Sequence, residues 1–291
     1  EVRSAAPAAP RVRGVVMLMV DALRADMLDR SIGGTRLTPE LVALEARGTH
    51  FDRAYATVPA THESVFAMLT GRRDAFEDPE RAMRDSLGAI LRARDVLTVG
   101  IYGHEALEDV LAPMNRSVFF GSGPTNKQRL TADISLEHVE QELDRVGDSP
   151  FFVFAHFYDV HAHYLDNPDF DFGDEVIERY AAEVAYVDAR LGRVFDAIER
   201  RGLEDETAIV VVSDHGEELW DHGYRWHRKR VYDESAHVVF DVRVPFGPPQ
   251  VVAAPVSLLD VAPTVLELLG VAVPPGLDGR SLVPVLAGSP I

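Results

Sequence analysis

The stretch TAIVVVSDHGEE, residues 207–218, joins a short run of mostly β-branched, apolar residues to acidic residues and a histidine. A run that is apolar at consecutive positions is typical of a strand buried on both faces of a parallel sheet. Three further segments have this character, namely GVVMLMVD (14–21), VLTVGIY (96–102) and FFVFAHF (151–157). Together the four segments predict the core of a mostly parallel central sheet.

Helical patterns lie between and after these strands. Residues 174–201 carry apolar side chains at alternating spacings of three and four, which predicts one apolar stripe along a helix. Residues 257–269 predict another helix, interrupted or restarted at Pro263. This alternation predicts an α/β fold with helices on both faces of the sheet and right-handed crossovers. The stripe consists of Ile177, Tyr180, Val184, Val187, Leu191, Val194 and Ile198.

The chain contains no internal repeat, and we expect a single domain over residues 14–291. Residues 1–13 are interpreted as a linker or N-terminal extension, because SAAPAAP at 4–10 is typical of a flexible linker. Proline and glycine cluster at 245–249 and 274–279, where we expect loops.

Composition excludes several classes of function. The net charge is −18, which disfavours nonspecific binding to nucleic acid. The 291 residues include no cysteine, so disulfides, thiolate metal sites and a cysteine nucleophile are excluded. An acidic protein that handles an anionic substrate needs a locally positive site, which a metal ion can provide.

Each predicted strand is followed by side chains able to bind a metal or an anion. In open α/β sheets ligands bind beyond the carboxyl ends of the strands, so these side chains should share one rim. Mixed carboxylate and imidazole ligands favour Zn²⁺ or Mn²⁺, with Mg²⁺ or Ca²⁺ as the alternatives. The set is Asp21, His104, Asp159, His161, His163, Asp214, His215, His222, His227 and Lys229.

Each of these residues alone is weak support for a site. An aspartate after a strand is commonly a turn residue or a helix cap. A lone histidine is commonly a hydrogen-bonded core or surface residue, and we interpret His50, His138, His156 and His237 in this way.

A further candidate is Thr61 in VPATHESVFAMLTGR, residues 58–72, where a proline-marked turn leads into a predicted short helix. A threonine at a helix start is commonly an N-cap. A threonine hydroxyl is a poor nucleophile at neutral pH, but metal coordination lowers its pKa, and the free N–H groups of a helix start favour an anion. Both interpretations of Thr61 are open at this point.

Several motifs resemble the sulfatase-like branch of the alkaline phosphatase superfamily, over roughly residues 14–287. Taken together these motifs are specific for the family, whereas SDHG alone is a moderate signal. They are VVMLMVDALRADML (15–28), LTGR (69–72), YAAEVAYVDARLGRVFDAIE (180–199), VVVSDHGEEL (210–219) and APVSLLDVAPTVLELLGVAVPPGLDGRSLVPVL (254–286).

The resemblance implies an alkaline-phosphatase-like fold and a role for each matching residue. The family's nucleophile position falls on Thr61, counted back from LTGR. The implied metal ligands are Asp21, Thr61, Asp214 and His215. The implied proton donors or oxyanion-binding residues are His161 of DVHAHY and His227, and the implied substrate contacts are His104 and Lys229.

The nucleophile segment departs from the sulfatase pattern. Sulfatases carry a cysteine or serine that is converted to formylglycine, within a C/S-x-P-x-R motif. Here the segment is THESV, with Thr61 at the nucleophile position and Val65 in place of the arginine. A threonine is similar to the phosphoglycerol and phosphoethanolamine transferases and to several phosphodiesterases of the superfamily, and therefore implies phosphate esters.

We accordingly expect a metal-dependent hydrolase or transferase that acts on phosphate esters through a covalent phosphothreonine intermediate. One alternative is a sulfatase or phosphonate hydrolase of the same fold. Another is a catalytically silent relative that binds an anionic ligand or a partner. We expect one divalent ion; Asp159 and His163, completed by His222 or His227, are candidates for a second ion or for substrate contacts.

The expected partner is an anionic ester, with no role for nucleic acid. The longest apolar runs are too short to cross a bilayer, so we expect membrane attachment only through a segment outside this chain. The chain begins at Glu1, which is compatible with a removed upstream anchor or signal. The family resemblance favours a periplasmic or other extracytoplasmic location.

Overall fold

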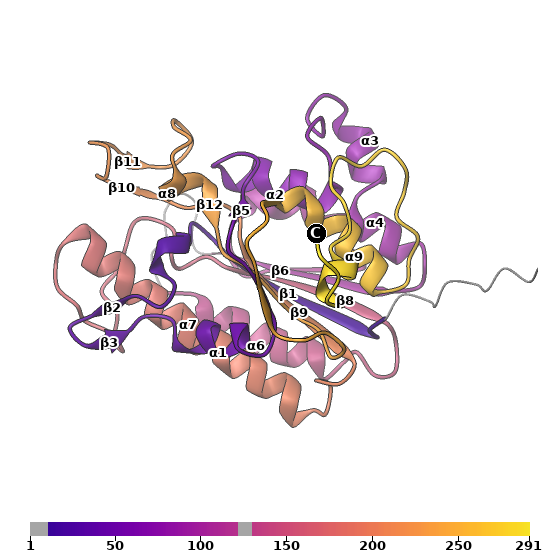
Figure 1. Ribbon diagram of the computed structural model, residues 1–291, viewed down its shortest axis with the longest axis horizontal. Coiled ribbons are helices and arrows are strands. Elements are labelled where there is room, and N and C mark those ends of the chain that lie inside the picture. The colour runs from indigo at the N-terminus through magenta and orange to yellow at the C-terminus, as the bar shows by residue number, and fades with distance from the viewer. Residues whose placement is uncertain (1–10, 122–129) are drawn as a thin grey trace, which may run out of the picture.

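The structure is a computed structural model that describes residues 11–121 and 130–291 (Figure 1). Its centre is an eight-stranded sheet in which every strand runs in the same direction except β13, which is antiparallel to both its neighbours. The predicted mostly parallel α/β fold is therefore confirmed. The strand order is β14 (Gln250–Val252), β4 (Thr49–Phe51), β13 (Phe240–Arg243), β9 (Thr207–Ser213), β1 (Gly14–Val20), β8 (Phe151–Phe157), β6 (Leu97–Tyr102) and β7 (Arg116–Phe119).

Strand β1 shows why these segments carry no polar face. Its odd-numbered side chains, such as Met17, lie in one hydrophobic core, and its even-numbered ones, such as Leu18, lie in the other. Successive side chains of a strand point to opposite faces, so a strand covered on both sides must be apolar at every position. Burying each such side chain contributes about 1.5–3 kcal/mol relative to leaving it exposed.

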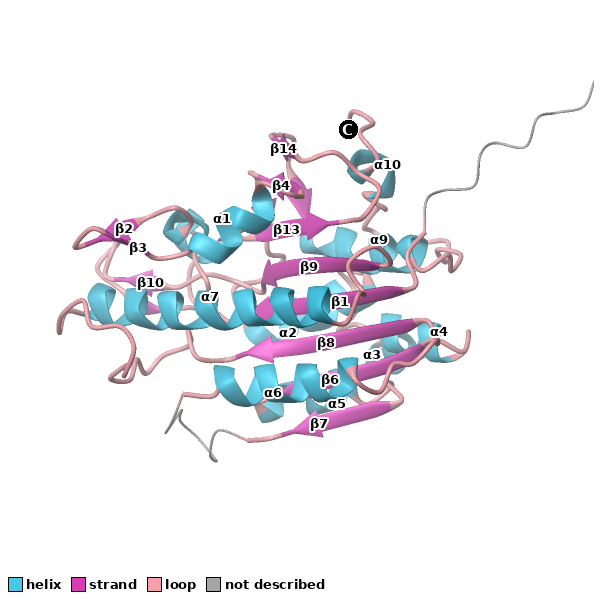
Figure 2. Cartoon of the chain, turned by 90° about the horizontal axis from the view of Figure 1, so that it is seen from below, coloured by secondary structure: helices cyan, strands magenta, loops and turns pink. Residues whose placement is uncertain are grey.

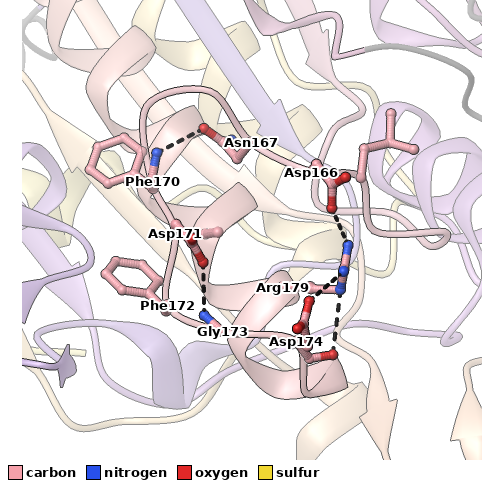
Figure 3. Close-up of a pocket in the computed structure, with 10 residues that line it drawn as sticks. Asp166, Asn167, Phe170, Asp171, Phe172, Gly173, Asp174 and Arg179 are labelled. Atoms are coloured by element: carbon pink, nitrogen blue, oxygen red, sulfur yellow. Dashed lines mark hydrogen bonds and ion pairs between the residues drawn. The ribbon is translucent and has the colours of Figure 1, made fainter.

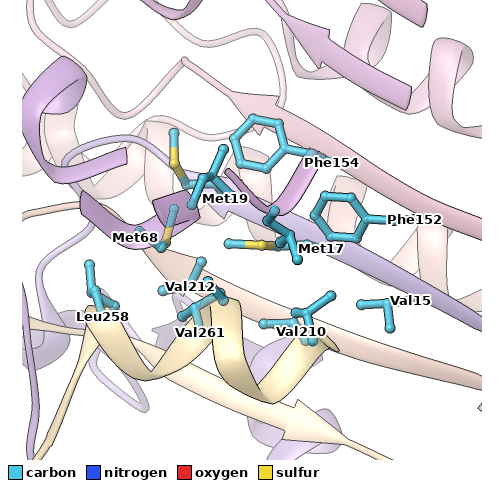
Figure 4. Close-up of a cluster of buried hydrophobic side chains, with 14 of the residues drawn as sticks. Val15, Met17, Met19, Met68, Phe152, Phe154, Val210, Val212, Leu258 and Val261 are labelled. Carbon is cyan, nitrogen blue, oxygen red and sulfur yellow. The ribbon is translucent and has the colours of Figure 1, made fainter. Parts of the chain in front are cut away.

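Helices cover both faces of the sheet, as predicted (Figure 2). One face packs against α1, α6 and α7, and the opposite face packs against α2, α4 and α9. Figure 4 shows the core on the face that α2, α4 and α9 cover. In this core, Met68 of α2 and Val261 of α9 face β1, β8 and β9. The helices on the two faces are α1 (Pro39–Glu45), α6 (Ala132–Leu143), α7 (Val176–Arg200), α2 (Thr61–Thr70), α3 (Pro79–Arg84), α4 (Leu87–Arg92), α5 (Glu108–Leu111), α9 (Val261–Leu268) and α10 (Val283–Leu286).

The two helices expected from periodicity are present. Helix α7 falls within the predicted range 174–201 and begins at a capping box, in which Glu175 and Glu178 each accept a hydrogen bond from the other's backbone N–H. The range predicted at 257–269 contains a short 3₁₀ helix, η3, followed by α9. Pro263 lies in the first turn of α9, where its missing N–H leaves no helical hydrogen bond unmade.

The remaining elements are short. None of the helices in the described part of the chain is both long enough and apolar enough to cross a membrane. These short elements are the strands β2 (Ser31–Ile32), β3 (Thr35–Arg36), β5 (Ala54–Tyr55), β10 (Glu218–Leu219), β11 (Arg225–Trp226), β12 (His237–Val238) and β15 (Val256–Ser257), and the helices η1 (Ala25–Met27), η2 (Glu105–Leu107), η3 (Leu258–Asp260) and α8 (Asp233–Ala236).

The expected N-terminal boundary needs a correction. The linker motif at 4–10 lies outside the described residues. Residues 11–13, which we had assigned to the same extension, pack on the domain: Val12 is buried in the core and its N–H donates to the Leu268 carbonyl. Arg13 forms an ion pair with Glu206. An apolar side chain and an ion pair therefore tie these residues to the folded body.

Candidate active site

The register of three parallel strands brings their ends to one level. Val20 of β1 lies opposite Phe157 of β8 and Ser213 of β9. The next residues of β1 and β9 are Asp21 and Asp214, so both carboxylates emerge at the same edge of the sheet. Both side chains are fully buried, as is that of His215.

Helix α2 brings Thr61 to this edge. The N-cap residue is Ala60, and Thr61 is the first residue of the helix, so the N-cap interpretation of Thr61 is wrong. Its hydroxyl Oγ1 instead lies 3.1 Å from Nε2 of His215. One turn further along α2, the Ser64 hydroxyl donates to the Asp214 backbone carbonyl at 2.6 Å, which fixes the helix start over the end of β9.

The geometry of this group fits a metal ion. Nε2 of His215 lies 3.4 Å from Oδ2 of Asp214 and 3.8 Å from Oδ1 of Asp21. Both carboxylate oxygens are buried and have no hydrogen-bond partner among the described residues. Leaving a buried charged oxygen unpaired is costly, and a shared cation removes that cost. The other oxygen of Asp214 accepts hydrogen bonds from the Ala22 and His215 backbone N–H groups.

The histidine of this group presents a free lone pair. Nδ1 of His215 lies 2.8 Å from the Gly216 carbonyl and donates to it, which leaves Nε2 as the acceptor. Burial, reinforced by nearby His227, lowers the pKa of His215 to about 3. Gly216 is required because a Cβ there would lie 2.0 Å from the Glu234 carbonyl oxygen. The backbone of Glu234 therefore approaches closely enough to hold this turn.

The two carboxylates differ in their proton affinity. Burial alone would raise the pKa of Asp21, but nearby His161 and a hydrogen bond from His156 outweigh it and hold that pKa well below its ordinary value. Burial and the negative charge of Asp21 raise the pKa of Asp214 well above its ordinary value. A cation between the two would allow both to be ionised together.

Three predicted histidines gather around Thr61 and His215. The ring of His227 lies 4.3 Å from that of His215 and 5.1 Å from that of His161, measured between centroids. His104 lies 6.3 Å from His161. Burial lowers the pKa of both His161 and His104. The structure thus brings together seven of the predicted residues: Asp21, Thr61, His104, His161, Asp214, His215 and His227.

Three further residues hold this group, and we had not predicted a role for them. His156, which we interpreted as an ordinary core histidine, lies with Nε2 3.0 Å from Oδ2 of Asp21. Nδ1 of His227 donates to buried Glu217 at 3.2 Å. Tyr158 stacks on His161 with ring centroids 4.9 Å apart. The available signal for His156 was its place as the one polar residue in the apolar run FFVFAHF, because a buried polar residue needs a partner.

The residues predicted for a second ion are not brought together. Asp159 is buried and accepts hydrogen bonds from the backbone N–H and hydroxyl of Thr131, the residue before α6. His163 is exposed and packs edge-on against Trp226. His222 pairs with Glu218 and stacks on Tyr232 with ring centroids 3.8 Å apart. These three residues therefore each have a different partner, Thr131, Trp226 and Glu218 respectively.

The predicted substrate contact Lys229 has an aromatic neighbour rather than a contact with the candidate ligands. It is exposed, and its ammonium lies 5.3 Å from the centroid of the Tyr224 ring. A hollow of about 140 Å³ lies elsewhere, between the start of α7 and the loop before it (Figure 3). Arg179 at its wall is paired with Asp166 and Asp174. None of the predicted site residues lines this hollow.

Comparison with known proteins gives a family match. The chain matches the Sulfatase family over residues 13–271. It belongs to the sulfatase family. Among relatives of this sulfatase family member, the steryl-sulfatase of Rattus norvegicus is 33% identical over 181 residues, which cover 57% of this chain and 31% of the relative. The choline-sulfatase of Rhizobium meliloti (strain 1021) is 35% identical over 130 residues, which cover 42% of this chain and 25% of the relative.

The solved structures confirm the fold of this sulfatase family member. A protein of the alkaline phosphatase superfamily from Vibrio parahaemolyticus superposes with a TM-score of 0.75 at 23% identity, covering 94% of this chain and 70% of that protein. The superposition confirms the predicted alkaline-phosphatase-like fold, and the match to the Sulfatase family confirms the predicted sulfatase-like branch. The chain spans about a third or less of the length of the curated relatives named above.

Proposed function

We propose that this chain is a metal-dependent hydrolase of anionic esters, with Thr61 as the nucleophile. The observation that carries the proposal is that Asp21, Asp214 and His215 lie together, that His215 contacts the Thr61 hydroxyl, and that two buried carboxylate oxygens of this group lack a hydrogen-bond partner among the described residues. A purely structural cluster would pair those oxygens with N–H or O–H donors.

The ligands of the ion would be Asp21, Thr61, Asp214 and His215. Two carboxylates, one imidazole and one hydroxyl favour Zn²⁺ or Mn²⁺ over ions that prefer oxygen alone. When bound, such an ion lowers the pKa of a neighbouring hydroxyl and offsets negative charge on the substrate. The second ion considered from the sequence is not part of this proposal, because each residue expected to hold it has another partner.

Different residues of the protein would bind the anion and transfer the proton. Thr61 lies at the first position of α2, where the backbone N–H groups of the first turn are free to bind the oxygens of an anion. His161 donates through Nδ1 to the Ala162 carbonyl, and His227 donates through Nδ1 to Glu217, so both present Nε2. These two nitrogens are the candidates for passing a proton to the departing ester oxygen.

Two classes of ester each have one specific observation in their favour. The relatives are a steryl-sulfatase and a choline-sulfatase, which supports sulfate esters. Thr61 supports phosphate esters, because a threonine side chain cannot be converted to the aldehyde that sulfatases use. The relatives support sulfate esters better than the phosphate esters that the sequence analysis placed first.

A matched pair of substrates tests the proposal. Turnover of 4-nitrophenyl sulfate and 4-nitrophenyl phosphate is measured for the purified chain with Zn²⁺ or Mn²⁺ added, beside Thr61→Ala. Hydrolysis of either ester that is lost in the variant supports the proposal, and the ratio of the two kcat/KM values assigns the class. Binding of inorganic sulfate or phosphate without turnover of any ester would instead favour the catalytically silent alternative.

A further inference from the structure

A short basic segment lies beside the candidate active site. Residues 225–230 read RWHRKR, so four of six positions are basic in a chain with a net charge of −18. The segment starts in β11 and continues into the loop that carries His227. Such a local excess of positive charge on an acidic protein favours an anionic ligand near this loop.

The two neighbours of His227 have a left-handed backbone. The φ angle is 91° at Trp226 and 81° at Arg228. Bulky side chains rarely adopt this conformation, and such residues cluster where a site requires it. Here it lets His227 contact His215 and His161 while Arg228, the next residue, reaches another element.

That element is the first turn of α2. Nη2 of Arg228 lies 4.0 Å from Oε2 of Glu63, two residues after Thr61. The side chain of Arg228 is 59% exposed, and an ion pair this long and this open contributes little. Most of the N–H donors of the guanidinium are therefore available to a ligand at the mouth of the site.

The other basic residues of the segment face elsewhere. Arg225 lies over the ring of Trp226 at 4.5 Å. Lys229 and Arg230 lie over Tyr224, at 5.3 and 5.5 Å from the ring centroid. Among these four side chains, Arg228 is the one that contacts α2 in the described part of the chain.

We propose that Arg228 is a specificity-determining residue that binds a second anionic group, located on the alcohol part of the ester. This rests on the proposed function, in which the reacting anion occupies the space beside the Thr61 hydroxyl at the start of α2. His227 borders that space, so the adjacent Arg228 meets the substrate beyond the reacting group. A planar guanidinium binds carboxylate, sulfate or phosphate through paired N–H donors, which suits a substrate with two anionic groups.

A binding experiment tests the inference without turnover. Benzenesulfonate and 4-sulfobenzoate are anions without a cleavable ester, and they differ by one carboxylate. The chain has two tryptophans, so Trp220→Phe leaves Trp226, two residues from Arg228, as the fluorescent reporter. In this background we expect 4-sulfobenzoate to bind about tenfold more tightly, the effect of one charge-assisted contact.

Three variants then test which residue causes the preference for 4-sulfobenzoate. Arg228→Gln should reduce the ratio of the two Kd values to about one, whereas Arg230→Gln, which removes the same charge from the same loop, should keep it. Glu63→Gln removes the competing carboxylate and should increase the ratio. An equal preference in Arg228→Gln and the parent, or no preference in the parent, would overturn the inference.

Kinetics separates this inference from the proposed function. The ratio of kcat/KM for a 4-nitrophenyl ester with and without a ring carboxylate should fall about tenfold in Arg228→Gln and stay within twofold in Arg230→Gln. If no ester is turned over while the Kd preference depends on Arg228, the proposed function fails and the second anion site stands. If esters are turned over with an unchanged ratio in Arg228→Gln, the second anion site fails alone.

Discussion

The hydroxyl of Thr61 lies 3.1 Å from Nε2 of His215, although 154 residues separate the two in the sequence. Both belong to segments that end at the same edge of the sheet, and both are buried. His215 also lies with Asp21 and Asp214 in a group whose side-chain atoms could hold a metal ion. The predictions below concern this group, the residues that orient it and one pair of residues outside it.

Replacing the proposed nucleophile should abolish turnover without unfolding the protein. We expect Thr61→Ala to lower kcat by about three orders of magnitude or more, because a nucleophile cannot be replaced by its neighbours. Thr61→Ser keeps a hydroxyl and should retain part of the rate. Activity is measured at saturating metal, and circular dichroism checks the fold. A Thr61→Ala rate within a fewfold of the parent would refute the role of Thr61.

Removing a proposed ligand should reduce metal binding. Asp214→Asn keeps the shape of the side chain but not its charge, and His215→Ala removes the Nε2 donor. The Tm of the parent chain should rise when Zn²⁺ or Mn²⁺ is added, since a ligand that binds only the folded state stabilises it. Both variants should lose most of this rise, and Asp214→Asn should not destabilise the metal-free protein because it relieves repulsion from Asp21. A full metal-dependent rise in both variants would contradict the assignment.

A residue outside the ligand set should also affect metal affinity. His156 donates to the second oxygen of Asp21 and so fixes the orientation of that carboxylate. Losing such a partner typically costs about 10–100-fold in metal affinity. We expect His156→Asn to show this loss by isothermal titration calorimetry. His138→Asn, which replaces a histidine stacked on Phe120, serves as the control and should bind metal as the parent does.

One equivalent of metal should be enough for full activity. The donors expected to hold a second ion have other partners, with Asp159 bound to Thr131 and His163 against Trp226. Titration of the metal-free protein should reach full activity at one equivalent, and His163→Ala should not change the stoichiometry. Two equivalents that fall to one in His163→Ala would show that a second site exists.

A pair on the far side of the sheet should make stability depend on pH. Nδ1 of His50 in β4 lies 2.7 Å from Oδ1 of Asp241 in β13, which is buried. Burial alone would lower the pKa of His50, but the hydrogen bond and charge of Asp241 outweigh it and raise that pKa. The contribution of His50 is therefore complete below its ordinary pKa of about 6.5 and is lost as the pH rises through the raised value.

The measurement compares the parent chain with His50→Gln. We expect the parent to be more stable by about 1 kcal/mol at pH 6, roughly 2 °C in Tm, and the difference to shrink toward pH 9. Asp241→Asn should remove the pH dependence of that difference. A gap in Tm that stays constant between pH 6 and pH 9 would show that the pair does not titrate in this range.

The sequence alone was sufficient for the four central strands and for helix α7, whereas helix α6 was not predicted. Strands β1, β6, β8 and β9 are buried on both faces and are therefore mostly apolar. This pattern can be recognised in the local sequence. The apolar stripe predicts helix α7 because most side chains of that stripe are buried. The antiparallel strand β13 was not predicted, because its buried Asp241 is compensated by His50, which is distant in the sequence.

The sequence also supplied Asp21, Thr61, Asp214 and His215, because three of them directly follow a strand and the fourth begins a helix. Only the tertiary structure decided which candidates meet. It placed Asp159 against Thr131, left Lys229 exposed and brought His156 and Glu217 to the site. Side-chain partners across strands depend on register and on helix placement, and both are fixed by packing over the whole domain. Local sequence therefore named the candidate ligands, while packing fixed the residues that orient them.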